Sequence, residues 1–414
     1  MNRNTSPRLR FAGFAGEWER KTLGEVTFKV KEKNTQLQYS ETLTNSAEFG
    51  IISQRDFFDN DVSNAENIGS YYVVQPNDFV YNPRISSFAP VGPIKRNKLG
   101  RTGVMSPLYY VFRLNNEAVL PSYLEHYFEG EQWHSFMFLN GDSGARSDRF
   151  SIKNDVFTEM PLALPTKPEQ TALGDFFRRL DETLAQARAR LAKTRQLKRA
   201  MLAKLFPAHG ETAPKLRFQG FSGDWERKML GDLGHCVSGV GFPEREQGGS
   251  DGIPFFKVSD MNLSDNEVVL KKANHYVTET QIAERKWQPI EQLPCIFFAK
   301  VGAALLLNRK RLVNQPFLLD NNTMAFIMNN GLNDYFIKTL FDTIELPELA
   351  QTGALPSINA KDVENVSVLI PPTSEEQTAI GNFFQKLDQT LALQSAVLEK
   401  LTQLKKALLA AMLV

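Results

Sequence analysis

The chain repeats itself at a spacing of half its length. The segment RLRFAGFAGEWERKTLGEV, which begins at Arg8, returns at Lys215 as KLRFQGFSGDWERKMLGDL, with twelve of nineteen positions identical. The 42 residues that begin at Pro165 return at Pro372 with 23 identities and the same shift of 207 residues. Each half of the chain therefore has a shared opening, a divergent middle and a shared tail, which predicts two tandem copies of one fold.

Each shared tail has the pattern of one long helix. Thr166 with Glu169, and the equivalent pair in the second half, have the spacing of a capping box. Apolar residues then recur at alternating intervals of four and three over about five heptads, as in a coiled-coil seam. We expect the two helices to pair antiparallel; the alternative is that each packs only on its own domain. The expected seam residues are Leu173, Phe177, Leu180, Leu184, Leu191, Ile380, Phe384, Leu387, Leu391 and Leu398.

The two middles predict compact α+β domains. Aromatic and β-branched runs such as YYVVQPNDFVY and TMAFIMNN are typical of short strands, and PSYLEHYFEGEQW and NDYFIKTLFD suit amphipathic helices. PAHGETAP, with two prolines and a glycine, ends the first helix. The expected organisation is a domain over residues 1–165, a helix over 166–206, a linker over 207–214, a second domain over 215–372 and a second helix over 373–414.

The lack of a recognisable catalytic motif in the sequence favours binding over catalysis. The sequence contains no phosphate-binding loop, no dinucleotide glycine fingerprint and no metal-ligand cluster, and YNPRI at Tyr81 fails as an amino-methyltransferase motif. The net charge is only +1, but residues 166–206 carry ten basic and four acidic side chains. Because no apolar run would span a bilayer and the first residues lack a signal-peptide core, we expect a cytoplasmic protein. We expect no metal and no cofactor in this chain.

Basic and amide side chains gather in turn-rich segments of the middles, where they could reach phosphates and base edges of DNA. Candidates in the first middle are Lys29, Lys31, Arg55, Asn82, Arg84, Lys95, Arg96, Lys98, Arg101, Arg146 and Arg149. Candidates in the second are Lys257, Lys300, Arg309, Lys310, Asn321, Asn322, Gln351 and Ser357. The densest cluster is PIKRNKLGR, although single loop charges are often only solvated. Trp18 and Trp225 lie in the shared openings, so we expect them to pack inside the domains rather than contact bases.

The order of these segments resembles the specificity subunit of type I restriction-modification enzymes. Both halves open with L-x-F-x-G-F-x-G-x-W. They close with a motif that stands here as LALPTKPEQTALGDFFRRLDETL and VLIPPTSEEQTAIGNFFQKLDQTL. The first copy departs from the family pattern at Pro168 and has Thr166 where a second proline is frequent. The resemblance covers essentially the whole chain.

The resemblance implies a non-catalytic DNA-binding subunit. Its two target-recognition domains would each read one half of a bipartite sequence, and the antiparallel helices would set the gap between the halves. The implied partners are double-stranded DNA, two methyltransferase subunits with S-adenosylmethionine, and two restriction subunits with ATP and Mg2+. Adenine methylation and DNA cleavage would then belong to these partners.

Two other functions stay open from the sequence. One is a coiled-coil scaffold with two protein-binding domains, which would bind DNA, if at all, without the steep salt dependence of a phosphate-contacting protein. The other is an enzyme with an unfamiliar site, which should retain a cofactor by itself.

Overall fold

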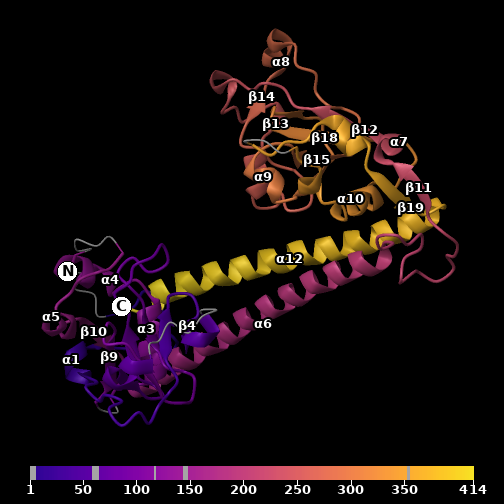
Figure 1. Ribbon diagram of the computed structural model, residues 1–414. Helices are drawn as coiled ribbons and strands as arrows, with labels where there is room; N and C mark the ends of the chain where they lie inside the picture. The colour runs from indigo at the N-terminus through magenta and orange to yellow at the C-terminus, as the bar shows by residue number, and fades with distance from the viewer. Residues whose placement is uncertain (1–5, 58–64, 116–117, 143–147, 352–354) are drawn as a thin grey trace. The chain divides into compact units, whose positions relative to one another are not determined.

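A computed structural model describes the chain except residues 1–5, 58–64, 116–117, 143–147 and 352–354 (Figure 1). The chain divides into two compact units. Unit 1 comprises residues 1–186 and 398–414, and unit 2 comprises residues 187–397. Each unit therefore contains one end of α6 (Lys167–Leu205) and one end of α12 (Ser374–Met412). In the described part of the chain, no helix is both long enough and apolar enough to span a membrane.

The centre of unit 1 is a four-stranded antiparallel sheet in the order β2-β9-β6-β7. Its strands are β2 (Thr27–Lys29), β9 (Tyr110–Leu114), β6 (Phe79–Tyr81) and β7 (Ile94–Arg96). Alternation along the strands sends Phe79 and Phe112 into one core, and Val80 and Val111 into another on the opposite face. The first core also contains side chains of α3 (Pro121–Glu129) and α5 (Asn154–Thr158).

Unit 2 is built on a sheet of the same order, β12-β18-β15-β16. These strands are β12 (Gly234–Ser238), β18 (Thr323–Met328), β15 (Cys295–Ala299) and β16 (Lys310–Val313). Phe298 joins the core that α10 (Asp334–Asp342) covers, whereas Phe297 points to the other face. The divergent middles thus share one sheet topology, because a pleated sheet needs apolar alternation rather than particular residues.

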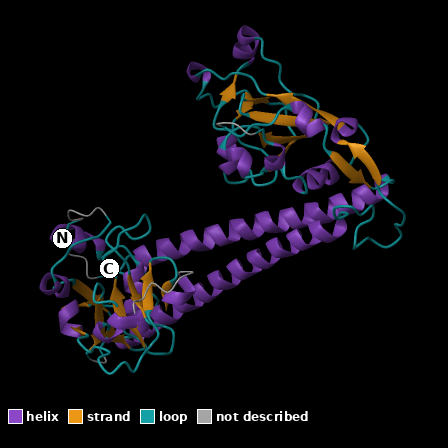
Figure 2. Ribbon diagram, viewed as in Figure 1, coloured by secondary structure: helices purple, strands orange, loops and turns teal. Residues whose placement is uncertain are grey.

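The remaining elements surround these sheets, and Figure 2 distinguishes their helices and strands by colour. In unit 1 they are β1 (Glu19–Thr22), α1 (Leu23–Val26), β3 (Leu43–Ser46), β4 (Gly50–Ser53), α2 (Gln54–Phe57), η1 (Ala65–Ser70), β5 (Tyr72–Val74), β8 (Gly103–Met105), α4 (His134–Asn140) and β10 (Pro161–Leu164). In unit 2 they are β11 (Glu226–Met229), α7 (Leu230–Leu233), η2 (Glu244–Glu246), β13 (Ile253–Phe256), η3 (Val258–Asn262), β14 (Tyr276–Val277), α8 (Glu279–Arg285), α9 (Ala303–Leu306), β17 (Leu318–Leu319), η4 (Leu346–Leu349), α11 (Ala360–Glu364) and β19 (Ser367–Ile370).

In both units the shared opening pairs with the strand that directly precedes the shared tail. Strand β1 runs antiparallel to β10, and β11 runs antiparallel to β19. Trp18 and Trp225 are each 3% exposed and belong to the cores, as their place in the shared opening predicts. The same contact continues toward the ends of the long helices. The Leu9 amide donates to the Ala411 carbonyl at 2.9 Å in unit 1, and the Leu216 amide donates to the Lys204 carbonyl at 2.8 Å in unit 2.

The predicted capping boxes are only partly present. The backbone amide of Glu376 donates to the Thr373 hydroxyl, so the hydroxyl half forms in the second tail. The carboxylate of Glu376 is instead held by Arg217, and that of Glu169 by Arg10. The spacing of Thr and Glu therefore predicted the helix starts correctly. The predicted partner of each glutamate, a backbone amide of the first turn, was wrong.

The two long helices meet in opposite directions within each unit. In unit 1, Leu173 and Phe177 near the start of α6 share a core with Met412 at the end of α12. In unit 2, Leu205 at the end of α6 shares a core with Phe384 near the start of α12. Of the other predicted seam residues, Leu184, Leu191 and Ile380 are buried, and Leu180, Leu387, Leu391 and Leu398 are partly exposed.

Candidate nucleic-acid interface

In unit 1, four of the predicted DNA-contacting residues come together at one end of the central sheet: Lys29, Asn82, Arg84 and Arg149. Strand β2 ends at Lys29, and Asn82 follows the last residue of β6. Arg84 and Arg149 form an isolated β-bridge, which brings together segments 65 residues apart in the sequence. The Asn82 amide donates to the Asn45 carbonyl at 2.8 Å, and its oxygen accepts from the Arg84 backbone amide at 3.0 Å. The turn after β6 is thus held by its own asparagine.

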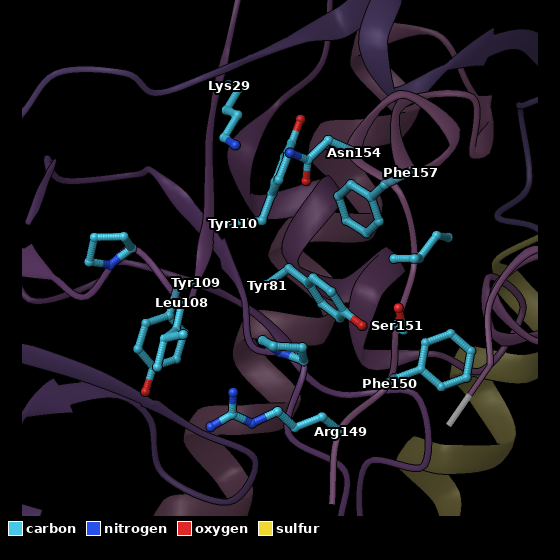
Figure 3. Close-up of a pocket in the computed structure, with 13 residues that line it drawn as sticks. Lys29, Tyr81, Leu108, Tyr109, Tyr110, Arg149, Phe150, Ser151, Asn154 and Phe157 are labelled. Carbon is cyan, nitrogen blue, oxygen red and sulfur yellow. The ribbon is translucent and has the colours of Figure 1, made fainter. Parts of the chain in front are cut away.

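A cavity of about 350 Å³ opens beside this turn (Figure 3). Tyr81, Tyr110 and Phe157 contribute aromatic rings to its wall, and Lys29 and Arg149 contribute cations. The remaining lining residues are Pro83, Pro107, Leu108, Tyr109, Phe150, Ser151, Ile152 and Asn154. The sequence predicted the two cations but not the cavity, because the wall of the cavity comes from four separate segments of the chain.

In unit 2, the corresponding end of the sheet also gathers predicted residues. The Lys300 amide donates to the Asn322 carbonyl at 2.9 Å, and the Lys300 carbonyl accepts from the Ile358 amide at 3.0 Å. The Gln351 amide donates to the Ser357 carbonyl at 3.0 Å. Asn321 and Asn322 are both exposed there. Since β15 matches β6 in the sheet order, Lys300 follows the same strand as Asn82 and Arg84 do in unit 1.

Three predicted basic residues of unit 2 are already engaged. Lys310 is 4% exposed, and its ammonium donates to the Ile344 carbonyl and to Asn308 Oδ1, each at 2.7 Å. Burial lowers the pKa of Lys310 to about 8. As a DNA contact Lys310 is therefore a wrong prediction, because the first residue of β16 points toward α10. Arg309 donates to Asn262, and Lys257 donates to Gln247.

The densest predicted cluster, PIKRNKLGR, is largely neutralised. Arg96 and Lys98 both form ion pairs with Glu125, which is 9% exposed. Arg101 binds Glu41 through two hydrogen bonds of 2.7 Å. Both acids are distant in the sequence, so the local charge count could not show the pairing.

The remaining first-middle candidates lie elsewhere. Lys95 is half-buried in β7, Lys31 and Arg55 are exposed, and Arg146 lies outside the described residues.

A cluster with metal-ligand character lies where α3 meets the long helices in unit 1. His126, Glu129 and Asp181 could place three ligand atoms around one ion. However, the ammonium of Lys405 lies 2.7 Å from Glu129 Oε2 and also binds Asp181. Burial acts to raise the pKa of Glu129, but the hydrogen bond from His126 and the charge of Lys405 outweigh it and hold that pKa below its ordinary value. The lysine thus supplies the positive charge that a metal would bring.

Unit 2 repeats this arrangement with the roles of the helices exchanged. Lys198 of α6 lies 2.7 Å from Asp388 Oδ1 of α12 and 3.1 Å from Asp342 Oδ2 of α10. Lys338 takes the place of His126 and binds both acids, at 3.0 and 2.7 Å. Burial acts to lower the pKa of Lys198, but the two carboxylates outweigh it and raise that pKa. The sequence signal was available, since Lys198 and Lys405 interrupt the apolar ladder at matching positions.

Comparison with known proteins gives a consistent result. Residues 222–403 match the family described as the type I restriction modification DNA specificity domain. The fold is similar to the crystal structure of a type I restriction-modification system S subunit from M. genitalium, with 15% identity, a TM-score of 0.63 and 99% of each chain covered. It is also similar to a structure described as the basis of complex assembly and conformational transition of a type I system, with 17% identity, a TM-score of 0.55 and coverage of 95% and 96%. No curated protein matches the chain. The expected α+β class with tandem domains and long helices is confirmed.

Proposed function

We propose that each unit of this chain, in which residues 222–403 match the type I restriction modification DNA specificity domain, reads one half of a bipartite DNA sequence. The family match and the fold support a DNA sequence-specificity subunit of a type I restriction-modification system. The chain carries no catalysis of its own in this proposal. It directs adenine methylation and DNA cleavage that partner subunits perform.

One observation carries this proposal: basic and amide residues of both divergent middles lie at the same end of two sheets of one topology. Arg84 and Arg149 lie there in unit 1, and Lys300 and Asn322 lie there in unit 2. Of the shared residues, the aromatic Trp18 and Trp225 are buried instead. A reader of two different half-sites needs this division, because the residues that contact bases must differ while the scaffold stays the same.

The helices serve as the spacer in this proposal, paired antiparallel along their length. The ion pairs support it: the step of 17 residues from Asp181 to Lys198 along α6 equals the step from Asp388 to Lys405 along α12. One antiparallel register therefore fits the pair in each unit. Inserting seven residues into α6 alone should abolish the recognised site or change its gap. Recognition of an unchanged site would contradict the spacer role.

The partners follow from the family. Double-stranded DNA, two methyltransferase subunits and two restriction subunits complete the proposed complex. S-adenosylmethionine, ATP and Mg2+ belong to those subunits. The exposed basic side chains of α6 offer either a path for spacer phosphates or a docking surface for the methyltransferase. A scaffold with two protein-binding domains is the competing function, and DNA affinity that does not fall with rising salt would favour it.

The deciding experiment sequences genomic DNA from cells that express the chain with the methyltransferase of its own system. We expect methylated adenines in one bipartite motif with a fixed gap. Cells with the methyltransferase alone are the control. If the complex assembles and no motif appears, the specificity function is wrong.

Single substitutions then assign the halves. Arg84→Ala should relax the sequence requirement in one half of the motif, and Lys300→Ala should relax it in the other. Arg101→Ala is the control, because the Arg101 guanidinium is already bound to Glu41. If both variants changed the same half, the model of one reader in each unit would fail.

A further inference from the structure

We propose that the cavity of unit 1 between Lys29 and Arg149 binds one unstacked nucleotide of a DNA strand. The inference rests on the proposed function, since it requires that this end of the sheet faces DNA. It goes beyond that function because reading base edges in a duplex needs no cavity.

The wall of the cavity suits a flat ring. Tyr81 and Tyr110 lie at the ends of paired strands, and both pack against Phe157 with ring centroids 5.0 Å apart. Their neighbours therefore fix these rings before any ligand arrives. A volume of about 350 Å³ lies within the range of roughly 300–1,000 Å³ that is usual for small-molecule sites. Tyr81, Tyr110 and Phe157 are at most 8% exposed and form the floor of the cavity, so the half-buried ring of Tyr109 is the lining aromatic on which a base can stack.

The charges suit phosphates. Lys29 lies with its ammonium 5.0 Å from the centre of the Tyr110 ring, and Arg149 is half-buried. In the described part of the chain neither cation has an acidic partner, and the described lining of the cavity contains no Asp or Glu. By contrast, Arg96, Lys98 and Arg101 of the same unit are all paired with glutamates. The two free cations are thus available to an anionic ligand.

The arrangement of the charges favours a nucleotide within a strand over a free one. Figure 3 shows Lys29 and Arg149 on opposite sides of the cavity, with Tyr81, Tyr110 and Phe157 between them. A nucleotide within a strand has a phosphate on each side of its sugar, whereas a free monophosphate has only one. The side chains of Ser151 and Asn154 also line the cavity and can form hydrogen bonds with a base edge.

The test measures binding of the full chain to labelled duplexes by fluorescence anisotropy. One duplex is fully paired, and the other carries a single unpaired, bulged nucleotide. We expect the bulged duplex to bind at least about tenfold more tightly, since unstacking is already complete and stacking on the cavity wall is gained. Lys29→Met and Arg149→Met should remove this preference. Lys153→Met is the matched control: Lys153 is exposed four residues from Arg149 and does not line the cavity, so its substitution should leave the ratio unchanged.

Each other outcome is decisive. Equal affinity of the unaltered chain for both duplexes would overturn the inference while leaving the proposed function intact. If the unaltered chain bound neither duplex, the proposed function itself would be contradicted. If deoxyadenosine monophosphate competed as well as the bulged duplex, the ligand of the cavity would be a free nucleotide and not a nucleotide within a strand. If the variants fail to fold, the unaltered chain can be tested with 2-aminopurine in the DNA. The fluorescence of 2-aminopurine at the bulged position must change when the chain binds. The fluorescence of 2-aminopurine at a paired position of the other duplex must stay constant.

Discussion

Arg10 binds Glu169 through two hydrogen bonds of 2.6 and 2.7 Å, across 159 residues of sequence. Arg217 binds Glu376 in the same way, across the same separation. Both glutamates are 1% exposed and lie in the first turn of a long helix. Each arginine also donates to a glycine carbonyl of its own opening, Gly16 or Gly223. The shared opening is thus fastened to the shared tail by one buried bidentate pair in each unit.

Arg10→Ala should destabilise unit 1 without affecting unit 2. The substitution leaves the Glu169 carboxylate buried without its cation, at a cost of roughly 2–3 kcal/mol. A urea titration followed by hydrogen exchange reads the two units separately, through peptides from residues 8–22 and 215–229. Arg8→Ala is the control, because Arg8 is exposed in the same segment. Equal loss in both units would show that the pair does not act locally.

Lys405→Met should be much more damaging than Lys406→Met. Lys405 is 16% exposed and neutralises Glu129 and Asp181, so its loss leaves two adjacent carboxylates at a cost of about 3 kcal/mol. Lys406 is 75% exposed in its pair with Glu131, which is worth less than about 1 kcal/mol. The free energy of unfolding of unit 1 measures the difference. Similar effects of both substitutions would contradict the role of Lys405 as the buried cation.

Gly381→Ala should loosen the contact between α10 and α12. A Cβ atom at Gly381 would lie 2.2 Å from Asn333 Oδ1, which caps α10 by accepting from the Phe336 amide at 2.9 Å. Displacing this cap and crowding the contact should cost on the order of 1–3 kcal/mol. Gly241→Ala is the control, since no atom lies within 4 Å of that position. Thermal unfolding of the two variants should differ clearly, and matching curves would be evidence against close packing at Gly381.

Lys310 should make unit 2 more stable at alkaline pH. Its pKa is about 8 in the folded chain and 10.5 in the unfolded chain, so the unfolded chain holds more protons between these values. Stability must then rise with pH over that window, by at most about 1.4 kcal/mol per pH unit. The difference in unfolding free energy between the unaltered chain and Lys310→Met should therefore grow in favour of the unaltered chain from pH 8 to 10. If this difference did not change with pH, the pKa of Lys310 would not be lowered by burial.

The sequence predicted those parts of the fold that depend on local pattern. The apolar ladder from Leu173 identified both long helices because helix packing repeats every three or four residues. The shared sheet topology of the middles was not predicted, since strands of three to six residues carry little signal and different side chains fill the same core. Glu169 was assigned to a capping box for a related reason: spacing along a helix cannot reveal an arginine 159 residues away.

The same limit applies to the candidate interface. Arg84 and Arg149 were selected as basic loop residues, and only the fold places them in one bridge. Lys98 and Arg101 were selected by the same rule, and only the fold pairs them with Glu125 and Glu41. Charge in a sequence shows where cations are, whereas their availability depends on acids that folding brings near.

The hydrogen bond from Leu9 to Ala411 has a consequence for the order of the chain. It matches the bond from Leu216 to Lys204, and residues 205–215 connect that second pair covalently. A segment of the same length would therefore join Ala411 to Leu9 and make opening, middle and tail into a closed cycle. A chain cut within residues 207–214 and joined in this way would keep the contacts of each unit while exchanging which unit is synthesised first. The contacts within each unit therefore do not depend on which half of the chain comes first.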